Sequence, residues 1–330
     1  MGFDSWSENI QELLYGSILG FAEASWAFIL AAFSVGDIGG SWWVPVIGGT
    51  ITTEIDGGET SVVEHPGMLN VMVRAMIPVL AIFVTLQMVL SAIRSYSAGF
   101  MRALFTALFA IPTTYILAGL VYAFLRAVDS LTMWMLDQGA GGGDSEEVVM
   151  SALLNLFGLT YNAETEEVLL DENYQHWAMA ADQGDPGKIL MPFILMLIIW
   201  LLCLLLMGMM LFRTVVIMLL TIFMPIAVFS VALEGAKAIF MRWLSLVVAL
   251  IIAKPLAAAA VMFGMSLGAM DDSWVQLVAG MIVIAVAAAM PVGMLLLVSF
   301  ATGGASDNIE RGATTAVKNT TQAGMRRFSR

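Results

Sequence analysis

Glu23 and Lys254 are ionisable residues inside apolar stretches that are long enough to cross a membrane. A charged side chain at the centre of a bilayer costs roughly 3 kcal/mol on insertion scales, so such residues usually face the interior of a helix bundle and form pairs. We therefore predict a contact between Glu23 and Lys254, as an intramembrane charged pair or as part of a hydrated path. The alternatives are that Glu23 extends to the membrane surface and that Lys254 bonds carbonyl groups freed by a neighbouring proline.

Prolines interrupt the same apolar stretches and follow basic residues at similar distances. Arg102 precedes Pro112 by ten residues, Arg213 precedes Pro225 by twelve, and Arg242 precedes Pro255 by thirteen. Proline has no backbone N–H, and inside a helix it leaves one carbonyl without its usual donor. We predict that helices break at Pro225 and Pro255, with the basic residues at the membrane boundary.

Other residues with catalytic or ligating chemistry are scarce. The two histidines, His65 and His176, lie in polar segments without ligand spacing, and the one cysteine, Cys203, lies in an uncharged run. The glycine-rich segment "GAGGGD" at 139–144 is acidic and would repel a phosphate, and the chain has no Walker A or dinucleotide motif. The sequence therefore predicts no catalytic residues, no metal site and no cofactor, and a protein that is not an enzyme.

Membrane helices are the elements that must position the charged and proline residues. Of the 330 residues, 60% are hydrophobic and 12% are charged, a composition far from that of a soluble globule. A helix rises about 1.5 Å per residue and the hydrocarbon core is about 30 Å thick. We predict an all-α integral membrane protein, a polytopic bundle with about six transmembrane helices at 12–35, 69–93, 103–127, 189–212, 243–268 and 275–300.

Two further segments have more than one interpretation. Segment 214–236 is apolar, is divided by Pro225 and is flanked by Arg213 and Lys237. We predict a broken or re-entrant segment, which is tolerated where protein or a water-filled cavity covers the backbone; the alternative is an ordinary seventh span with the N-terminus outside. Segment 1–11 is amphipathic, and it either lies at the interface, packs on a partner or extends the first span.

The distribution of charge predicts the orientation of the chain. The net charge is −12, and segments 36–67 and 137–187 together hold sixteen acidic residues and no Lys or Arg. Basic residues gather instead around 94–102 and 237–242 and in the tail 301–330. Because cytoplasmic loops carry an excess of Lys and Arg, we predict exterior loops at 36–68 and 128–188 and a cytoplasmic C-terminus. The expected location is the cytoplasmic membrane.

Local patterns within the two loops predict small elements. The run "TITTEI" favours a hairpin in the loop 36–68, where Trp42 and Trp43 would suit a membrane-surface belt. Asp144 and Glu147 have capping-box spacing, which predicts a short helix in the loop 128–188. Gly264 and Gly268 have the spacing that permits close helix packing, either within the chain or between subunits.

The block 189–300 resembles the TrbL family of polytopic inner-membrane subunits from conjugative type IV secretion systems. The resemblance rests on a long apolar run, the proline-broken segment "RTVVIMLLTIFMPIAVF", and a polar link leading to "FMRWLSLVVALIIAKPLA". Phe240, Arg242 and Trp243 at the start of that last stretch are the most characteristic residues. The low Lys content and acidic loops depart from typical Gram-negative members and suggest an actinobacterial or archaeal relative.

The resemblance implies a non-enzymatic channel or scaffold of a DNA-transfer machine that acts by oligomeric assembly. Implied partners are other secretion-system subunits, including cytoplasmic ATPases and pilin-like proteins, the lipid bilayer, DNA in transit and further copies of the chain. Carried over, Arg213, Arg242 and Trp243 would be structural and partner-facing residues. The alternative, from the intramembrane charges, is an ion-coupled secondary transporter with a midplane site at Glu23 and Lys254.

Overall fold

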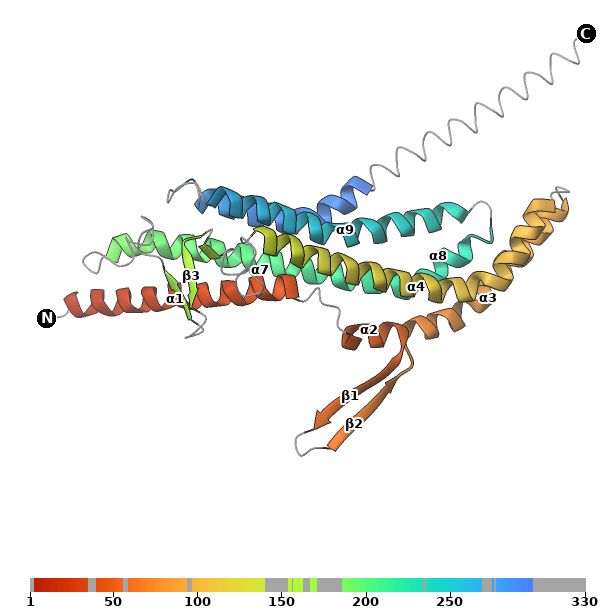
Figure 1. Cartoon of the computed structure of the whole chain (residues 1–330), viewed down its shortest axis with the longest axis horizontal. Coiled ribbons are helices and arrows are strands. Elements are labelled where there is room, and N and C mark those ends of the chain that lie inside the picture. Colours follow the sequence, from red (N-terminus) through yellow and green to blue (C-terminus); the bar gives the residue numbers. More distant parts are fainter. Residues whose placement is uncertain are drawn as a thin grey trace, which may run out of the picture.

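The protein is an elongated bundle of long helices in the computed structural model (Figure 1). The structure describes residues 3–34, 40–55, 59–93, 97–139, 154–155, 157–162, 167–170, 186–233, 236–268, 275 and 277–298. Its helices are α1 (Phe3–Ser34), α2 (Gly40–Ile47), α3 (Met68–Ile93), α4 (Ser97–Gly139), α7 (Pro186–Ile222), α8 (Met224–Ser230), α9 (Lys237–Gly268) and a last helix, Leu277–Val298.

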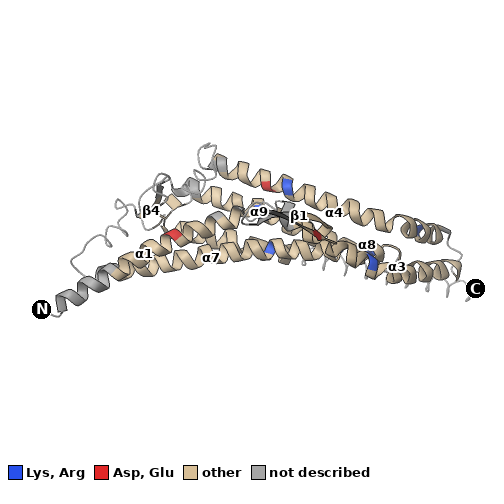
Figure 2. Cartoon of the chain, turned by 90° about the horizontal axis from the view of Figure 1, so that it is seen from below, with Lys and Arg blue, Asp and Glu red and all other residues tan. Residues whose placement is uncertain are grey.

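Six helices in the described part of the chain are long and apolar enough to cross a membrane. Each overlaps one of the six predicted stretches, and few charged residues interrupt them (Figure 2). The prediction of an all-α polytopic membrane protein is therefore confirmed. Within the predicted amphipathic segment 1–11, residues 3–11 are continuous with the first span, because α1 begins at Phe3.

Two of the helices are much longer than predicted. α4 has 43 residues and α7 has 37, which correspond to about 64 and 55 Å at the usual rise per residue. The sequence placed span boundaries at 127 and 212, but Asp129 and Arg213 lie inside α4 and α7. The boundary between the predicted span 189–212 and the segment 214–236 is therefore wrong.

The two predicted helix breaks have different outcomes. α7 ends at Ile222 and α8 starts at Met224 with Pro225 in its first turn, so a break lies at this proline. α9 continues through Pro255, so the break predicted there is wrong. The reason lies in the contacts that Ile251 makes, described below.

The loop 36–68 contains the expected hairpin, formed by β1 (Gly49–Ile55) and β2 (Glu59–His65), which pair antiparallel with Gly49 opposite His65. The hairpin extends from the side of the bundle (Figure 1). The Asn70 side chain fixes its base, because its amide donates to the Ile47 carbonyl at 3.1 Å and to the Pro66 carbonyl at 2.7 Å. Gly67 has φ +74°, and any side chain there would overlap the Ile47 backbone.

Helix α2 in the same loop was not predicted. It buries Trp43, whose ring stacks on Tyr122 of α4 with centroids 5.4 Å apart, so the predicted membrane-surface role of Trp43 is wrong. The loop 128–188 contributes a second hairpin, β3 (Leu159–Asn162) with β4 (Glu167–Leu170). The short helix expected after Asp144 lies largely outside the described residues, as do His176, Arg94 and the tail 301–330.

The buried side chains form two hydrophobic clusters, one at each end of the bundle. What we call the α1 cluster joins α1, the end of α4, the first half of α7, the second half of α9 and the last helix; it includes Ile18, Ile29, Leu136, Ile199, Cys203, Ala257, Val261 and Ile284. What we call the α3 cluster joins α3, the first half of α4, the end of α7, α8 and the first half of α9; it includes Leu69, Ala110, Ile217, Phe229, Trp243 and Leu250. α4, α7 and α9 pass from one cluster to the other.

Candidate functional site

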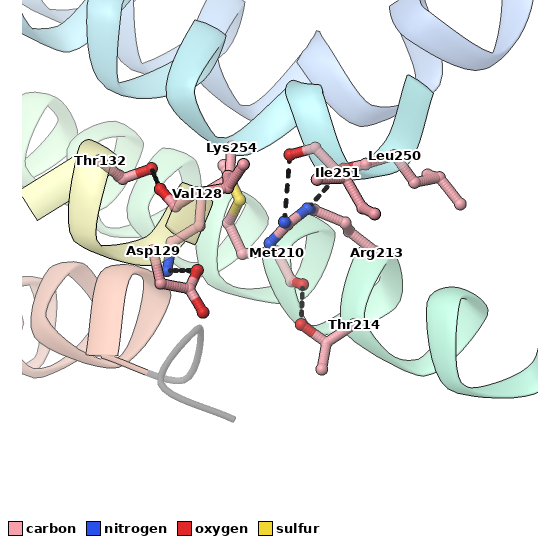
Figure 3. Close-up of polar contacts among 9 residues, drawn as sticks. All are labelled: Val128, Asp129, Thr132, Met210, Arg213, Thr214, Leu250, Ile251 and Lys254. Carbon is pink, nitrogen blue, oxygen red and sulfur yellow. Dashed lines mark hydrogen bonds and ion pairs between the residues drawn. The ribbon is translucent and has the colours of Figure 1, made fainter. Parts of the chain in front are cut away.

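A buried set of charged residues lies where α4, α7 and α9 pass between the two clusters. We call Asp129 of α4, Arg213 of α7 and Lys254 of α9 the polar junction (Figure 3). On α7 the α1 cluster ends at Met210 and the α3 cluster starts at Ile217, with Arg213 between them. On α9 the corresponding boundary lies between Ile251 and Ala257, and Lys254 falls inside it.

Lys254 forms an ion pair with Asp129. Its Nζ donates to Oδ1 of Asp129 at 2.7 Å, and the two side chains are 1% and 15% exposed. The predicted partner was Glu23, but that side chain is exposed on α1. The prediction of a Glu23–Lys254 pair is therefore wrong, because α4 continues past its expected end and brings Asp129 to the ammonium group.

Arg213 bonds the backbone of α9 at the turn before Pro255. Its Nε donates to the Leu250 carbonyl at 2.7 Å and its Nη2 donates to the Ile251 carbonyl at 3.3 Å. In a helix the Ile251 carbonyl would accept from the residue four positions later, which is Pro255 and has no N–H. The arginine side chain therefore supplies the donor that the proline lacks, and the backbone continues as a helix.

Trp243 makes a matching contact in the opposite direction. Its indole Nε1 donates at 2.8 Å to the carbonyl of Leu220, which lies in the last turn of α7. The last four carbonyls of a helix have no partner within the helix, so Trp243 of α9 satisfies one of them just before the break at Pro225. Thus Arg213 of α7 donates to carbonyls of α9 near Pro255, and Trp243 of α9 donates to a carbonyl of α7 near Pro225.

Two threonines next to the junction have hydrogen-bond partners within their own helices. The Thr132 hydroxyl donates to the Val128 carbonyl at 2.7 Å, and the Thr214 hydroxyl donates to the Met210 carbonyl at 3.1 Å, each within its own helix (Figure 3). Arg126, one turn before Asp129, is exposed and lies over the Tyr122 ring at 5.7 Å. The buried part of the junction therefore consists of two cations and one carboxylate.

Of the three residues expected to face partners, two are buried and one is exposed. Arg213 is 2% exposed and Trp243 is 6% exposed, so both serve contacts within the chain. Arg242 is exposed near the start of α9, where an intermolecular role is open to it. Arg242 and Trp243 differ in exposure because adjacent residues of a helix point about 100° apart.

Gly264 is a helix-packing residue within the chain. A Cβ atom at this position would lie 2.7 Å from Cγ1 of Val283 on the last helix, so only glycine allows this approach. The sequence left open whether the contact is internal or between subunits, and for Gly264 it is internal. The side chain environment of Gly268 lies outside the described residues.

The arrangement is suited to holding helices together at membrane depth. Among the described residues, no group of three or more His, Cys, Asp or Glu side chains could hold a metal ion. The lysine is paired with a carboxylate and the arginine donates to two backbone carbonyls, so each buried cation has polar partners within the chain. These contacts join α9 to both α4 and α7 at one level of the bundle.

Sequence reasoning selected Arg213, Trp243 and Lys254 but missed Asp129. The residue falls in the predicted loop 128–188, because the third span was predicted to end at 127. The apolar sequence "SLTMWML" that follows Asp129 was the available signal that the helix continues. Similarity to known proteins adds no residue to this set, because no protein-family model, curated protein or solved structure matches the chain.

Proposed function

We propose that the chain is a non-enzymatic channel or scaffold subunit of a type IV secretion-like machine that transfers DNA across the cytoplasmic membrane. The observation that carries the proposal is the TrbL-like layout of 189–300, with the sequence from Phe240 to Trp243 opening its second-last helix. That layout is supported by the contact of Trp243 with Leu220, which ties the proline-broken segment to the following helix.

The chemistry of the described residues is compatible with a role in assembly. The buried charges are used for bonds between helices, and large apolar side chains cover the outer faces of the helices, as lipid contact or subunit packing requires. We place the C-terminus in the cytoplasm, where the basic tail 301–330 would meet an ATPase, anionic lipid or DNA phosphate. Lys237 and Arg242, both exposed, would lie at the same membrane surface.

The test is co-purification from native membranes with the full-length chain carrying an affinity tag. We expect a secretion ATPase and pilin-like subunits to co-purify, and we expect deletion of the chain to abolish DNA transfer while leaving the ATPase expressed. Arg242→Glu should weaken the ATPase association, because the residue is exposed at the expected cytoplasmic boundary. A chain that purifies without any secretion subunit, and whose deletion leaves DNA transfer intact, would refute the proposal.

The alternative is an ion-coupled secondary transporter, and the polar junction is the observation that favours it. Ionisable residues in transmembrane segments often mark ion or substrate pathways. The site would now rest on Lys254 and Asp129, with Glu23 excluded from it by its exposed position. Uptake of a solute into liposomes that contain only this chain, lost in Asp129→Asn, would support transport over secretion.

A further inference from the structure

We propose that Pro255 is a latched hinge in α9, and that the Arg213 side chain is the latch. The latch is closed in this structure because Arg213 bonds the Ile251 carbonyl, and its release would allow the two halves of α9 to pivot. The inference concerns this chain alone and does not depend on the proposed function.

The first supporting feature is the missing hydrogen bond. Pro255 removes the donor for the Ile251 carbonyl, and the proline ring also pushes that carbonyl away from the helix axis. Sharp kinks in helices occur at such positions. Arg213 reaches this point with two charge-assisted bonds, to Leu250 at 2.7 Å and to Ile251 at 3.3 Å. The local weakness of α9 is therefore compensated by one side chain from another helix.

The second feature is the position of the hinge relative to the packing. The residues of α9 before Pro255, including Val247 and Ile251, belong to the α3 cluster. The residues after it, including Ala257 and Val261, belong to the α1 cluster. A pivot at Pro255 would change the angle between these two halves of α9 at the boundary between the two clusters. A pivot in the middle of one cluster would instead separate residues that pack within the same cluster.

The third feature is the ion pair of Lys254, the residue next to Pro255, with another helix. Lys254 bonds Asp129 of α4 at 2.7 Å, so the turn of α9 at Pro255 is held from α7 on one side and from α4 on the other (Figure 3). Arg213 is 2% exposed and Lys254 1% exposed. Loss of either contact would leave a buried charge without its partner, which is strongly disfavoured in a water-poor interior.

The experiment measures the distance distribution between spin labels on the two halves of α9 in the full chain in lipid nanodiscs. Val248 and Phe263 suit labelling because they are 44% and 62% exposed, and the background carries Cys203→Ala because Cys203 is the one native cysteine. We expect a narrow distribution in the parent chain and a broad one in Arg213→Met. In Arg213→Met with Pro255→Ala we expect the narrow distribution to return, because the backbone N–H of the introduced alanine supplies the missing donor.

A matched control is Pro112→Ala in α4, an exposed proline inside another long helix. It should not restore the narrow distribution to Arg213→Met. Denaturation of the parent chain, the two single variants Arg213→Met and Pro255→Ala, and the double variant forms a double-mutant cycle. We expect the effect of Arg213→Met on the unfolding equilibrium constant to be roughly tenfold or more smaller when Pro255→Ala is present.

Two results with a folded Arg213→Met chain would refute the latch. One is a distance distribution as narrow as that of the parent chain, and the other is a broad distribution that Pro255→Ala fails to narrow. Where Arg213→Met alone does not fold, recovery of the fold by Pro255→Ala, but not by Pro112→Ala, supports the latch. Failure of Pro255→Ala to recover the fold refutes it.

Discussion

Pro225 and Pro255 lie in similar sequence contexts but have opposite effects on their helices. α7 ends at Ile222, and Pro225 lies in the first turn of α8, where a missing N–H is tolerated. Pro255 lies in the middle of α9, and the helix continues through it. The difference is in the donors supplied by the neighbouring helix: one neutral indole N–H near Pro225, and a guanidinium with two bonds near Pro255.

A proline in a membrane helix therefore does not by itself determine a break. Membrane helices tolerate proline where neighbouring groups satisfy the freed backbone. At Pro255 the compensation is charged and buried, so the region should be sensitive to the loss of a charge. At Pro225 the compensation is a single neutral hydrogen bond at a helix end, so the region should be less sensitive.

The largest effect is expected for Asp129→Ala, which leaves the buried Lys254 ammonium without its carboxylate partner. Loss of one partner of a buried ion pair costs about 3 to 5 kcal/mol in the free energy of unfolding, measured by denaturation in detergent. The double variant Asp129→Ala with Lys254→Met should recover most of this loss. A single variant as stable as the parent chain would show that the Pro255 region does not depend on charge.

A smaller effect is expected for Arg213→Lys, because an ammonium cannot reproduce the two-pronged geometry of the guanidinium. We expect a loss of about 2 kcal/mol in the free energy of unfolding, since the Ile251 carbonyl would lack a donor. The control is Arg242→Lys, an exposed site where the change should stay within about 0.5 kcal/mol. Equal effects at the two positions would contradict the role of Arg213.

Trp243→Phe tests the Pro225 side of the comparison. It keeps most of the ring contact with Phe240 but removes the hydrogen bond to Leu220, so we expect a loss of about 1 kcal/mol in the free energy of unfolding. Trp134→Phe is the matched control, since Trp134 is 60% exposed. A loss larger than that of Arg213→Lys would reverse the ranking of the two regions.

The smallest effect is expected for Pro225→Ala. The proline occupies the first turn of α8, where its missing N–H has no helical partner to lose, so the free energy of unfolding should change by less than about 0.5 kcal/mol. Amide exchange of Leu219 to Ile226 would report whether α7 then extends into α8. Marked stabilisation with a continuous helix would show that the proline alone maintains this break.

The sequence was sufficient to predict that the six long helices exist and to select most of the residues of the junction. Six apolar stretches coincide with six helices because burial of such stretches in lipid requires internally bonded backbone. Arg213, Trp243, Pro255 and Lys254 were selected by residue type. Their contacts could not be predicted: Arg213 was expected at the membrane boundary, Lys254 was expected to pair with Glu23, and Trp243 was expected to be a structural and partner-facing residue.

By itself, the sequence determined which stretches are apolar enough to form membrane-spanning helices. It also determined that Pro255 leaves the Ile251 carbonyl without a donor, since this depends on local covalent structure. The tertiary structure alone decided which side chain supplies that donor and that Lys254 pairs with Asp129, which lies 125 positions away along the chain. The physical reason is that a charge in a water-poor interior pairs with whichever group helix packing brings within hydrogen-bond distance.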